Sequence, residues 1–371
     1  MPTARPRITL LRSNPVSPDP RVEKEARLLS ELAEVTILAW DRTGTLPRHE
    51  ERAYATIERF NGPAPYGSLA ILGQLVRFNL WLAWKLLRHP GNIVHACDLD
   101  TGFTAALVSL IRRFPLVYDM FDMYAEANSE LLPAPALRLA VALESWVVRV
   151  ARVTIIVDEA RRAQIKGMRP KQLAVIYNAP EDQGAATPTQ NSKLEVFYAG
   201  VLAKNRGFAY LVKAIAGLPK VHLSVAGFGQ DEEFVRQEVE SHQATFLGRI
   251  PYEEVLEHSR QADVLFALYD PIVKNHRYSS PNKLFEAMML GKPIIVSDGT
   301  GMSDIVTKVG NGLVVPYGDA DALTAAVGRL TDPKLRQEMG VKGRRAYEAT
   351  YGWTKMADTL RGVYAELLGC T

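Results

Sequence analysis

The stretch RYSSPNKLFEAMMLGKPIIVSDGTG, residues 277–301, constrains the fold more than any other part of the sequence. It predicts a loop, a helix over 281–290, a turn and a buried strand over 294–296, since a short apolar run is typical of a strand with both faces covered. Ser280 is a suitable N-cap for a helix whose first residue is a proline, because proline lacks the N–H that would go unbonded there. Gly291 supplies a C-terminal stop. A helix that leads into such a strand indicates an open α/β sheet.

Three polar residues fall together on the predicted helix, away from its core face. Asn282, Lys283 and Glu286 stand at positions i, i+1 and i+4, so they cluster near the positive N-terminal end of the helix. A helix N-terminus beside a lysine suits a diphosphate, and a carboxylate one turn further along suits a pair of sugar hydroxyls. The stretch alone fits an ordinary capped helix with a solvated polar face equally well.

The chain has 371 residues, which is too long for one ordinary core and fits two domains. Its net charge of +3 is too small to indicate a nucleic-acid partner. Residues 1–180 contain 23 basic and 18 acidic side chains, and the remainder contains 21 and 23. A basic first half is compatible with an anionic acceptor or an anionic membrane surface. The two cysteines, Cys97 and Cys370, have no metal-site or disulfide spacing and favour a reducing, cytoplasmic location.

Strand and helix patterns alternate along both halves of the chain. The first half opens with a strand over 7–12, a helix over 20–32 and a strand over 35–40, the start of a doubly wound α/β domain. The segment EDQGAATPTQNS lacks apolar periodicity and is typical of a linker, and a second α/β pattern follows it. The parts that we expect are a first domain over 1–180, the linker over 181–192, a second domain over 193–352 and a C-terminal helix over 353–371 that crosses back to the first domain.

A long apolar helix is predicted over 66–89. It contains Trp81 and Trp84 together with three cations, a mixture that suits a membrane interface or a lipid-bearing acceptor. A core helix of a large domain is the favoured alternative, because this helix is apolar nearly all round. No segment is a transmembrane candidate, since polar residues interrupt even this helix.

Polar residues accompany the ends of two predicted strands in the first half. Asp119 and Asp122 belong to one of these strand ends, and His95 and Asp98 belong to the other. Ligands of open α/β sheets bind at the carboxyl ends of the strands, so these side chains are candidates for a site. The alternatives are that the aspartates cap the next helix and that His95 is a satisfied histidine within its strand.

Glycines and cations follow the first two strands of the second half. One loop contains Gly200, Lys204 and Arg206, and the next strand ends at Gly227 and Gly229. Glycine lets the backbone approach a ligand closely, although a pair of glycines is a weak motif by itself.

The order and spacing of these loops carry a family resemblance. The segments are GVLAKNRG, AGFGQ, FLGRIPYEEV, SSPNKLFEAMMLGKPIIVSD and NGLVVPYGD in the second half, and DPRVEKEARLL, VTILAWDR, IVHACDLDTG and LVYDMFDMY in the first. Together they resemble the retaining glycosyltransferases of family 4, over nearly the whole chain. The resemblance implies a GT-B fold, in which two doubly wound Rossmann-like domains face a central cleft. It also implies transfer of a sugar from a nucleotide sugar to an acceptor hydroxyl with retention, with no cofactor and no required metal.

The resemblance also implies roles for individual residues. Glu286 matches the second glutamate of the family's E-x7-E motif, which bonds the ribose hydroxyls, and Arg206 matches the cation that neutralises the diphosphate. The implied catalytic residues are Asp122, which is favoured over Asp119, and Arg206, with Lys204 as a second candidate. The implied donor site comprises Gly200, Gly227, Gly229, Arg249, Ile250, Ser280, Pro281, Asn282, Lys283 and Glu286. The implied acceptor side comprises Asn14, Asp19, His95 and Asp98, although a helix cap fits Asp19 better.

Three positions depart from the family pattern. Tyr278 stands where the first glutamate of E-x7-E is expected, and Phe121 stands where many members have a histidine close to the sugar. Val201 replaces an arginine that often follows the glycine. Lys204 and Arg206, the two cations of that loop, are candidates to compensate for its missing positive charge. The missing glutamate and histidine keep open a catalytically silent nucleotide-sugar-binding protein. A sugar-nucleotide 2-epimerase is a second alternative, because it shares the same fold.

We therefore expect transfer of a hexosyl or N-acetylhexosaminyl group, with UDP favoured over GDP as the donor nucleotide. A basic first domain with a tryptophan-bearing helix favours a lipid-linked or glycan acceptor in the assembly of a cell-surface glycan. The expected partners are the nucleotide sugar, this acceptor and an anionic membrane surface, with no nucleic acid. The expected location is cytoplasmic, with peripheral attachment to the inner face of the cytoplasmic membrane. A soluble small metabolite is the alternative acceptor.

Overall fold

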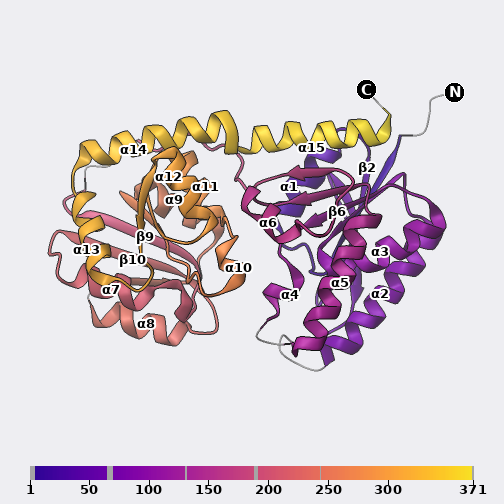
Figure 1. The fold of residues 1–371 in the computed structure, drawn as a ribbon, viewed down its shortest axis with the longest axis horizontal. Coiled ribbons are helices and arrows are strands. Elements are labelled where there is room, and N and C mark those ends of the chain that lie inside the picture. The colour runs from indigo at the N-terminus through magenta and orange to yellow at the C-terminus, as the bar shows by residue number, and fades with distance from the viewer. Residues whose placement is uncertain (1–4, 65–69, 130–131, 188–190, 243, 370–371) are drawn as a thin grey trace. The chain divides into compact units, whose positions relative to one another are not determined.

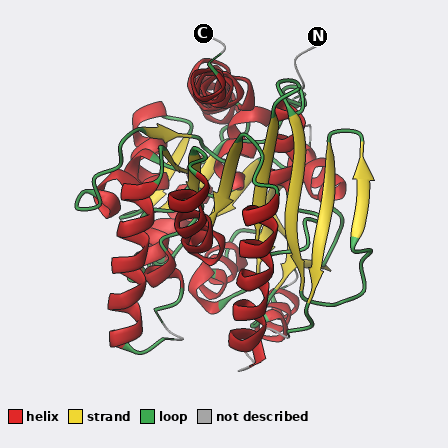
Figure 2. Ribbon diagram, turned by 90° about the vertical axis from the view of Figure 1, so that its right-hand side faces the viewer, coloured by secondary structure: helices red, strands yellow, loops and turns green. Residues whose placement is uncertain are grey.

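The computed structural model describes residues 5–64, 70–129, 132–187, 191–242 and 244–369. The chain forms two compact units (Figure 1), which are Met1–Ile176 with Ala357–Thr371, and Tyr177–Met356. Each unit is built on one sheet of mainly parallel strands, and Figure 2 shows the helices packed against the strands. The predicted α/β class is therefore confirmed.

The first unit contains an eight-stranded sheet in the order β3-β4-β2-β1-β5-β6-β7-β8. Its strands are β1 Arg7–Arg12, β2 Glu34–Asp41, β3 His49–Arg52, β4 Ala55–Asn61, β5 Ile93–Cys97, β6 Leu116–Met120, β7 Val153–Ile156 and β8 Leu173–Val175. Its helices are α1 Pro20–Leu29, α2 Ala70–Arg88, α3 Asp98–Arg112, α4 Tyr124–Ala127, α5 Ala134–Val150, η1 Glu159–Arg161 and α6 Arg162–Ile165. Neighbouring strands are parallel except β3 and β4, which form an antiparallel pair.

The central strands of this sheet are buried along their whole length because helices cover both faces. Every residue of β5 and β6 is buried. Helices α2, α3 and α5 pack on one face around Phe78 and Tyr118. Side chains alternate along a strand, so His95 and Asp119 point to the other face. There they contact α1 and the C-terminal helix α15, Trp353–Leu368.

The second unit contains a six-stranded sheet in the order β11-β10-β9-β12-β13-β14, with every neighbouring pair parallel. Its strands are β9 Leu194–Val201, β10 Val221–Phe228, β11 Thr245–Gly248, β12 Val264–Ala267, β13 Ile294–Ser297 and β14 Gly312–Val315. Its helices are η2 Lys204–Arg206, α7 Phe208–Ala216, α8 Glu232–Ser241, α9 Tyr252–Gln261, α10 Lys274–Arg277, α11 Asn282–Leu290, α12 Gly301–Val309, α13 Ala320–Arg329, α14 Pro333–Ala346 and η3 Tyr347–Tyr351.

Each sheet has a point where the strand order reverses. This point lies between β1 and β5 in the first unit and between β9 and β12 in the second. Ligands of doubly wound sheets bind outside the carboxyl ends of the strands at such a point. The loops that leave these four strands are therefore where a ligand is expected.

Helix α11 differs in one respect from its predicted form. It begins at Asn282, and Pro281 occupies the N-cap position in an extended conformation with φ −68° and ψ 157°, so the predicted cap by Ser280 is wrong. The fixed φ of proline is compatible with this extended entry as well as with a first helical turn. The predicted stop is confirmed, because Gly291 ends the helix with a φ of 67°.

Helix α2 is not buried on all sides, contrary to the favoured prediction. Phe78 and Leu82 are wholly buried, whereas Leu80 is 66 % exposed and Trp84 is 45 % exposed. The helix therefore has one face in the core and a second apolar face at the surface. Its predicted first residues, 66–69, lie outside the described residues. In the described parts of the chain no helix combines the length and the apolar character needed to cross a membrane.

The predicted linker contacts the second unit where the structure describes it. Residues 181–187 form no helix or strand. Asp182 accepts two hydrogen bonds of 2.7 Å from Arg344 of α14. Residues 188–190 of the predicted linker, and Cys370, lie outside the described residues.

Candidate active site

The candidate site of the second unit forms where the end of β9 meets the N-terminus of α11. Gly200 has a φ of 149°, and a Cβ atom there would lie 2.4 Å from Nζ of Lys283. The backbone conformation favours glycine here, and the absence of a side chain lets the lysine ammonium pack directly against the end of β9. The lysine lies in the first turn of α11, so its ammonium group stands beside a helix N-terminus, which favours an anion.

Tyr269, in the loop after β12, lies between two cations. Cζ of Arg206 is 3.6 Å from the centroid of the Tyr269 ring, and Nζ of Lys283 is 5.9 Å from it. The ring of Tyr198 in β9 is 4.6 Å from the same lysine. Ser297, at the end of β13, fixes the Tyr269 backbone, because its hydroxyl accepts from the N–H at 2.8 Å and donates to the carbonyl at 2.6 Å. Residues from the ends of β9, β12 and β13 therefore hold the two cations together.

Both cations lack an anionic partner among the residues that the structure describes. Nε and Nη1 of Arg206 are buried there without a hydrogen-bond acceptor. Burial lowers the pKa of Lys283, but the neighbouring Tyr198 and Tyr269 outweigh this effect and hold it above the usual value, so the ammonium stays charged. A buried donor without an acceptor costs about 1–3 kcal/mol, so the arrangement gains stability when an anion occupies it.

Glu286 lies one turn further along α11 and is only 5 % exposed. Tyr252, the first residue of α9, donates a hydrogen bond of 2.9 Å to its Oε1. Burial, and then the adjacent carboxylate, raise the pKa of Tyr252 above its ordinary value, so the phenol stays protonated and continues to donate. The tyrosine thus fixes the orientation of the carboxylate that was predicted to bond the ribose hydroxyls.

Lys204 and Arg206 share a loop but have different neighbours. Lys204 is exposed, and its Nζ lies 5.3 Å from the ring centroid of Phe234 in α8. Arg206 instead stacks on the aromatic ring that also attracts Lys283. Of the two predicted candidates, the structure brings only Arg206 to the α11 N-terminus.

The predicted base-reading segment lies at the carboxyl ends of the outer strands. Arg249 follows β11 and is exposed, and its Cζ lies 4.6 Å from the ring centroid of Phe228 at the end of β10. Ile250 is partly buried beside it in the chain. The exposed Phe228 ring was not predicted as a site residue, and it gives this segment a flat aromatic surface.

Gly227 and Gly229 have a structural requirement that the motif did not reveal. Gly227 has a φ of 149°, and a Cβ atom on it would lie 1.9 Å from the carbonyl oxygen of Gly200. A Cβ atom on Gly229 would lie 2.2 Å from the carbonyl oxygen of Leu202. Gly227 and Gly200 face each other at the ends of β10 and β9, and Gly229 and Leu202 follow these strands, so the close approach is between the two strand ends and the loops that leave them.

The entrance to α11 contains the remaining predicted donor residues. Ser280 is buried, and Pro281 and Asn282 are partly buried at the helix N-terminus. Tyr278, which stands in place of the family's first glutamate, immediately follows α10 and is partly buried. The structure thus brings these residues to the same helix end as Lys283.

In the first unit, Asp98 lies at the point where the strand order reverses. It accepts a hydrogen bond of 2.9 Å from the N–H of Phe121 and pairs with Arg12 at 2.5 Å. Burial raises the pKa of Asp98 to about 6, although Arg12 opposes this change. Asp19 caps α1 by accepting a bond of 3.2 Å from the N–H of Val22, so the cap alternative is confirmed for this residue.

Asn14 and Asp122 occupy the same edge of the sheet. Asn14 donates a hydrogen bond of 2.7 Å to Asp19. The side chain of Asp122 is 49 % exposed and accepts a hydrogen bond of 2.8 Å from Arg161. Asp122 is therefore the half-exposed carboxylate among the two predicted catalytic aspartates.

Phe121, the residue in place of the family's histidine, packs against two arginines. Cζ of Arg12 lies 4.3 Å from the centroid of its ring and Cζ of Arg21 lies 4.8 Å from it. The position thus supplies a cation-binding aromatic face, which orders the arginines, instead of a titratable imidazole.

Asp119 and His95 do not reach the surface, and both are wholly buried. Nη2 of Arg21 donates to both oxygens of Asp119, at 3.0 and 2.9 Å, and Nε2 of His95 is 3.5 Å from one of them. Nδ1 of His95 is 2.7 Å from the hydroxyl of Tyr364 in α15. The predictions of a catalytic Asp119 and an acceptor-side His95 are corrected, because both side chains are packed in the core, where Asp119 pairs with Arg21 and His95 is bonded to Tyr364. The ligand atoms of Glu25, His95 and Asp119 lie within 4.8 Å of one another, but Arg21 already supplies the cation there.

Sequence reasoning missed the residues that hold the predicted ones in place. They are Arg12, Arg21 and Arg161 in the first unit, and Tyr198, Tyr252, Tyr269 and Ser297 in the second. Arg21, Tyr252 and Ser297 stand inside three of the quoted family segments, so the resemblance contained a signal for them. Tyr269 had no signal except its place after a predicted strand.

Two family models match the chain. Residues 18–179 match the glycosyl transferase 4-like domain, and residues 193–332 match the glycosyl transferases group 1. The glycogen synthase of Mycobacterium tuberculosis is 24 % identical over 290 residues, which cover 74 % of this chain and 68 % of that protein. A GDP-mannose-dependent monoacylated alpha-(1-6)-phosphatidylinositol monomannoside mannosyltransferase of Corynebacterium glutamicum is 31 % identical over 173 residues, 44 % of each chain.

Solved structures show the same fold. Sucrose-phosphate synthase of Thermosynechococcus elongatus superposes with a TM-score of 0.79 at 17 % identity, over 99 % of this chain and 100 % of that one. Anabaena HepE, solved in complex with UDP-glucose, superposes with a TM-score of 0.74 at 16 % identity, over 97 % and 100 %. With both halves matched, this chain belongs to the glycosyltransferases of the GT-B fold, with a glycosyl transferase 4-like domain followed by a group 1 domain.

Proposed function

We propose that this protein is a retaining glycosyltransferase that takes a hexosyl or N-acetylhexosaminyl group from a nucleotide sugar, UDP-linked rather than GDP-linked. The observation that carries the proposal is the pair of cations, Arg206 and Lys283, which the described residues leave without an anionic partner at the N-terminus of α11. A nucleoside diphosphate is the leaving group, so negative charge develops on its β-phosphate oxygens. Fixed cations and a helix N-terminus stabilise that charge. The fold shared with HepE, which was solved with UDP-glucose, supports UDP.

The remaining residues take roles around this diphosphate site. Glu286, oriented by Tyr252, bonds the ribose hydroxyls. Asp122, the half-exposed carboxylate at the edge of the first sheet, orients the acceptor hydroxyl or bonds the sugar. The two cations supply the positive charge at the diphosphate, so we assign no role to a metal or a further cofactor.

We propose a lipid-linked or glycan acceptor and peripheral attachment to the inner face of the cytoplasmic membrane. Relatives include the mannosyltransferase named above and a lipopolysaccharide core glycosyltransferase of Rhizobium meliloti. The exposed apolar face of α2, where Trp84 has Arg88 4.6 Å from its ring centroid, supports attachment to an anionic lipid surface.

Calorimetric titration with UDP, GDP, ADP and their glucose conjugates tests the donor site. We expect saturable binding of UDP by the wild type and its loss in Glu286→Ala. Arg206→Ala should raise the barrier to turnover by about 2–4 kcal/mol, as other lost electrostatic donors do. Lys204→Ala is the matched control, because Lys204 is in the same loop but is exposed near Phe234. An equal effect of the two cation variants, or normal activity of Glu286→Ala, would contradict the site.

Turnover distinguishes the other functions on this fold. Conversion of the sugar nucleotide into an epimer without any acceptor would establish the 2-epimerase alternative. Binding without transfer or hydrolysis, across lipid-linked and soluble acceptors, would establish a silent binding protein. Transfer to a soluble metabolite alone would refute the lipid-linked acceptor and leave the donor site intact.

A further inference from the structure

A groove of about 510 Å³ lies between α2, α3 and α5 of the first unit. Its walls include Leu75, Val76, Leu80, Phe103, Leu107 and Leu139. The volume falls within the range of about 300–1,000 Å³ of sites for small molecules, which are mostly apolar. The walls are helix surfaces, whose backbone polar groups are bonded within the helices, so they offer little to a hydrogen-bonding ligand. A ligand without polar groups along its length, such as a hydrocarbon chain, fits these walls.

One part of the groove lies at the carboxyl edge of the sheet. Asp100 and Tyr124 line it, and they belong to the first turns of α3 and α4, which follow β5 and β6. Ser13, in the loop after β1, donates a hydrogen bond of 2.8 Å to Asp100. Asp98 and Asp122 belong to the same edge. An amphiphile with its chain in the groove would therefore place its polar head beside the residues proposed for the acceptor.

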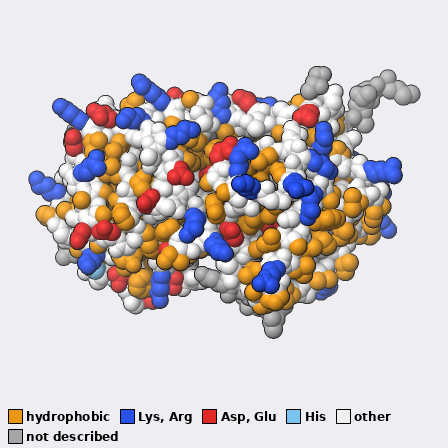
Figure 3. All heavy atoms as spheres, in the orientation of Figure 1, with side chains coloured by type: hydrophobic (Ala, Val, Ile, Leu, Met, Phe, Trp, Pro, Cys, Tyr) orange, Lys and Arg blue, Asp and Glu red, His pale blue; other side chains and the backbone are white. Residues whose placement is uncertain are grey.

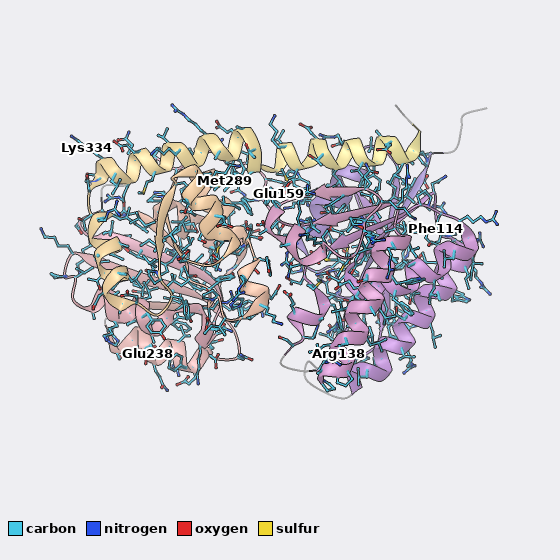
Figure 4. The ribbon with its side chains drawn as sticks, viewed as in Figure 1. Phe114, Arg138, Glu159, Glu238, Met289 and Lys334 are labelled. Carbon is cyan, nitrogen blue, oxygen red and sulfur yellow. The ribbon has the colours of Figure 1, made fainter. Side chains whose placement is uncertain are left out.

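The surface around the groove is apolar and cationic. Among the described residues, ten of the fifteen exposed large hydrophobic side chains belong to α2, α3 and α5, so exposed apolar surface is concentrated there. Figure 3 shows hydrophobic side chains gathered where Figure 1 draws these helices. The cations of the three helices are Arg77, Lys85, Arg88, Arg112, Arg149 and Arg138, the last of which is labelled in Figure 4.

The carboxylates of these helices do not balance the cations, of which Lys85 is paired with Glu58 of β4. These carboxylates are Asp98, Asp100 and Glu144. Asp98 is paired with Arg12, and Glu144 is wholly buried. An apolar face with a positive border matches an anionic amphiphile, in which a phosphate or acidic head accompanies a hydrocarbon chain.

We propose that this groove binds the hydrocarbon chain of a lipid-linked acceptor, with the polar head of the acceptor at the Asp100 part of the groove. The inference rests on the proposed glycosyl transfer and deepens it by assigning the acceptor class to named residues. The groove then holds a single chain drawn out of the bilayer, and the surrounding apolar face contacts the membrane surface.

Calorimetric titration of the full chain with monomeric octyl and decyl glucoside tests the groove. A neutral head keeps these probes away from the cations of the nucleotide site. We expect saturable binding of one molecule, with Kd falling about fourfold for each added methylene, which is ~0.8 kcal/mol per methylene. Leu80→Gln should raise Kd about tenfold, because it puts an amide into the apolar wall.

Leu110→Gln is the matched control. Leu110 is 60 % exposed and Leu80 is 66 % exposed, and only Leu80 lines the groove. An unchanged Kd in Leu110→Gln, with loss in Leu80→Gln, supports chain binding. The proposal is overturned if monomeric glucosides do not bind to the wild type. It is also overturned if both variants bind phosphatidylglycerol vesicles equally weakly while neither variant changes the Kd for glucosides. A dimer in sedimentation that Leu80→Gln dissociates would assign the groove to a second copy and also overturn it.

UDP titration of the same samples separates this inference from the proposed function. Binding of UDP without binding of decyl glucoside refutes the groove and leaves the transferase. Binding of decyl glucoside without UDP or any other nucleotide supports the groove and refutes the donor assignment.

Discussion

A buried glutamate of α5, next in the chain to the groove residue Leu143, gives the most quantitative prediction. Glu144 of α5 is wholly buried, and its Oε1 accepts a hydrogen bond of 2.9 Å from the hydroxyl of Tyr118 in β6. Its Oε2 is buried without a partner among the described residues. Burial raises the pKa of Glu144 to about 7, against the hydrogen bonds from Tyr118 and the N–H of Tyr124. The carboxyl group is thus close to half protonated at neutral pH.

The direction in which stability changes with pH follows from the number of protons that the folded and the unfolded states bind. The folded pKa exceeds the unfolded value, so the folded state binds the extra proton between about pH 4 and pH 7, and stability falls as pH rises through this window. The folded pKa of about 7 compares with an unfolded value of about 4.3, and at 1.36 kcal/mol per pKa unit the ionised form costs roughly 4 kcal/mol. At pH 5 most of that cost is absent, so the free energy of unfolding should fall by roughly 3 kcal/mol between pH 5 and pH 8 through Glu144 alone.

Glu144→Gln removes this titration and keeps the shape of the side chain. We expect the variant to match the wild type within about 1 kcal/mol at pH 5 and to exceed it by roughly 4 kcal/mol at pH 8. Urea unfolding followed by tryptophan fluorescence measures the first unit, because four of the five tryptophans, Trp40, Trp81, Trp84 and Trp146, belong to it.

An exposed glutamate provides the control for this measurement. The side chain of Glu159 is 54 % exposed, so Glu159→Gln should change stability by less than about 0.5 kcal/mol at either pH. A stability difference between Glu144→Gln and wild type that stays constant from pH 5 to pH 8 would refute the reasoning. It would mean that the carboxyl group is solvated or paired in the folded chain.

Three further substitutions test the packing around both sites. Gly227→Ala should destabilise the second unit by more than about 2 kcal/mol in thermal unfolding, because its Cβ would lie 1.9 Å from a carbonyl oxygen at the end of β9; an unchanged Tm would contradict this. Tyr252→Phe should raise the Kd for UDP about tenfold at unchanged Tm, because Glu286 loses the donor that orients it, and equal affinity in calorimetry would exclude that role. Tyr364→Phe leaves Nδ1 of His95 buried without its partner and should cost about 1–3 kcal/mol of unfolding free energy, whereas an unchanged urea midpoint would show that water replaces the hydroxyl.

The strands and helices were largely predictable because their causes are local. Apolar runs, helix stops and the alternation of strand and helix patterns predicted two α/β units, and the stop at Gly291 is confirmed. The cap at Ser280 was wrong, because a proline permits both an extended entry and a helical turn, and local sequence does not choose between them.

The sequence predicted where in the fold the candidate site lies better than it predicted which of its side chains contact one another. Parallel strands place their carboxyl ends at one edge, so the sequence alone placed Arg206, Lys283 and Glu286 after such strands or on the next helix. Which of Lys204 and Arg206 lies near Lys283 depends on the position of Tyr269, and that residue belongs to the loop after β12, far along the chain.

In the first unit, burial determined which of the predicted site residues remain accessible to a ligand. Asp119 and Asp122 are three residues apart in the sequence, yet one lies in a core ion pair with Arg21 and the other is half exposed. Asp119 lies within β6, where every residue is buried, whereas Asp122 lies beyond the end of this strand in the loop before α4. The sequence by itself therefore determined the fold class, the family and the edge of each sheet where chemistry is expected. The tertiary structure decided which charges are neutralised in the core and which remain for a ligand, because that depends on partners distant in the chain.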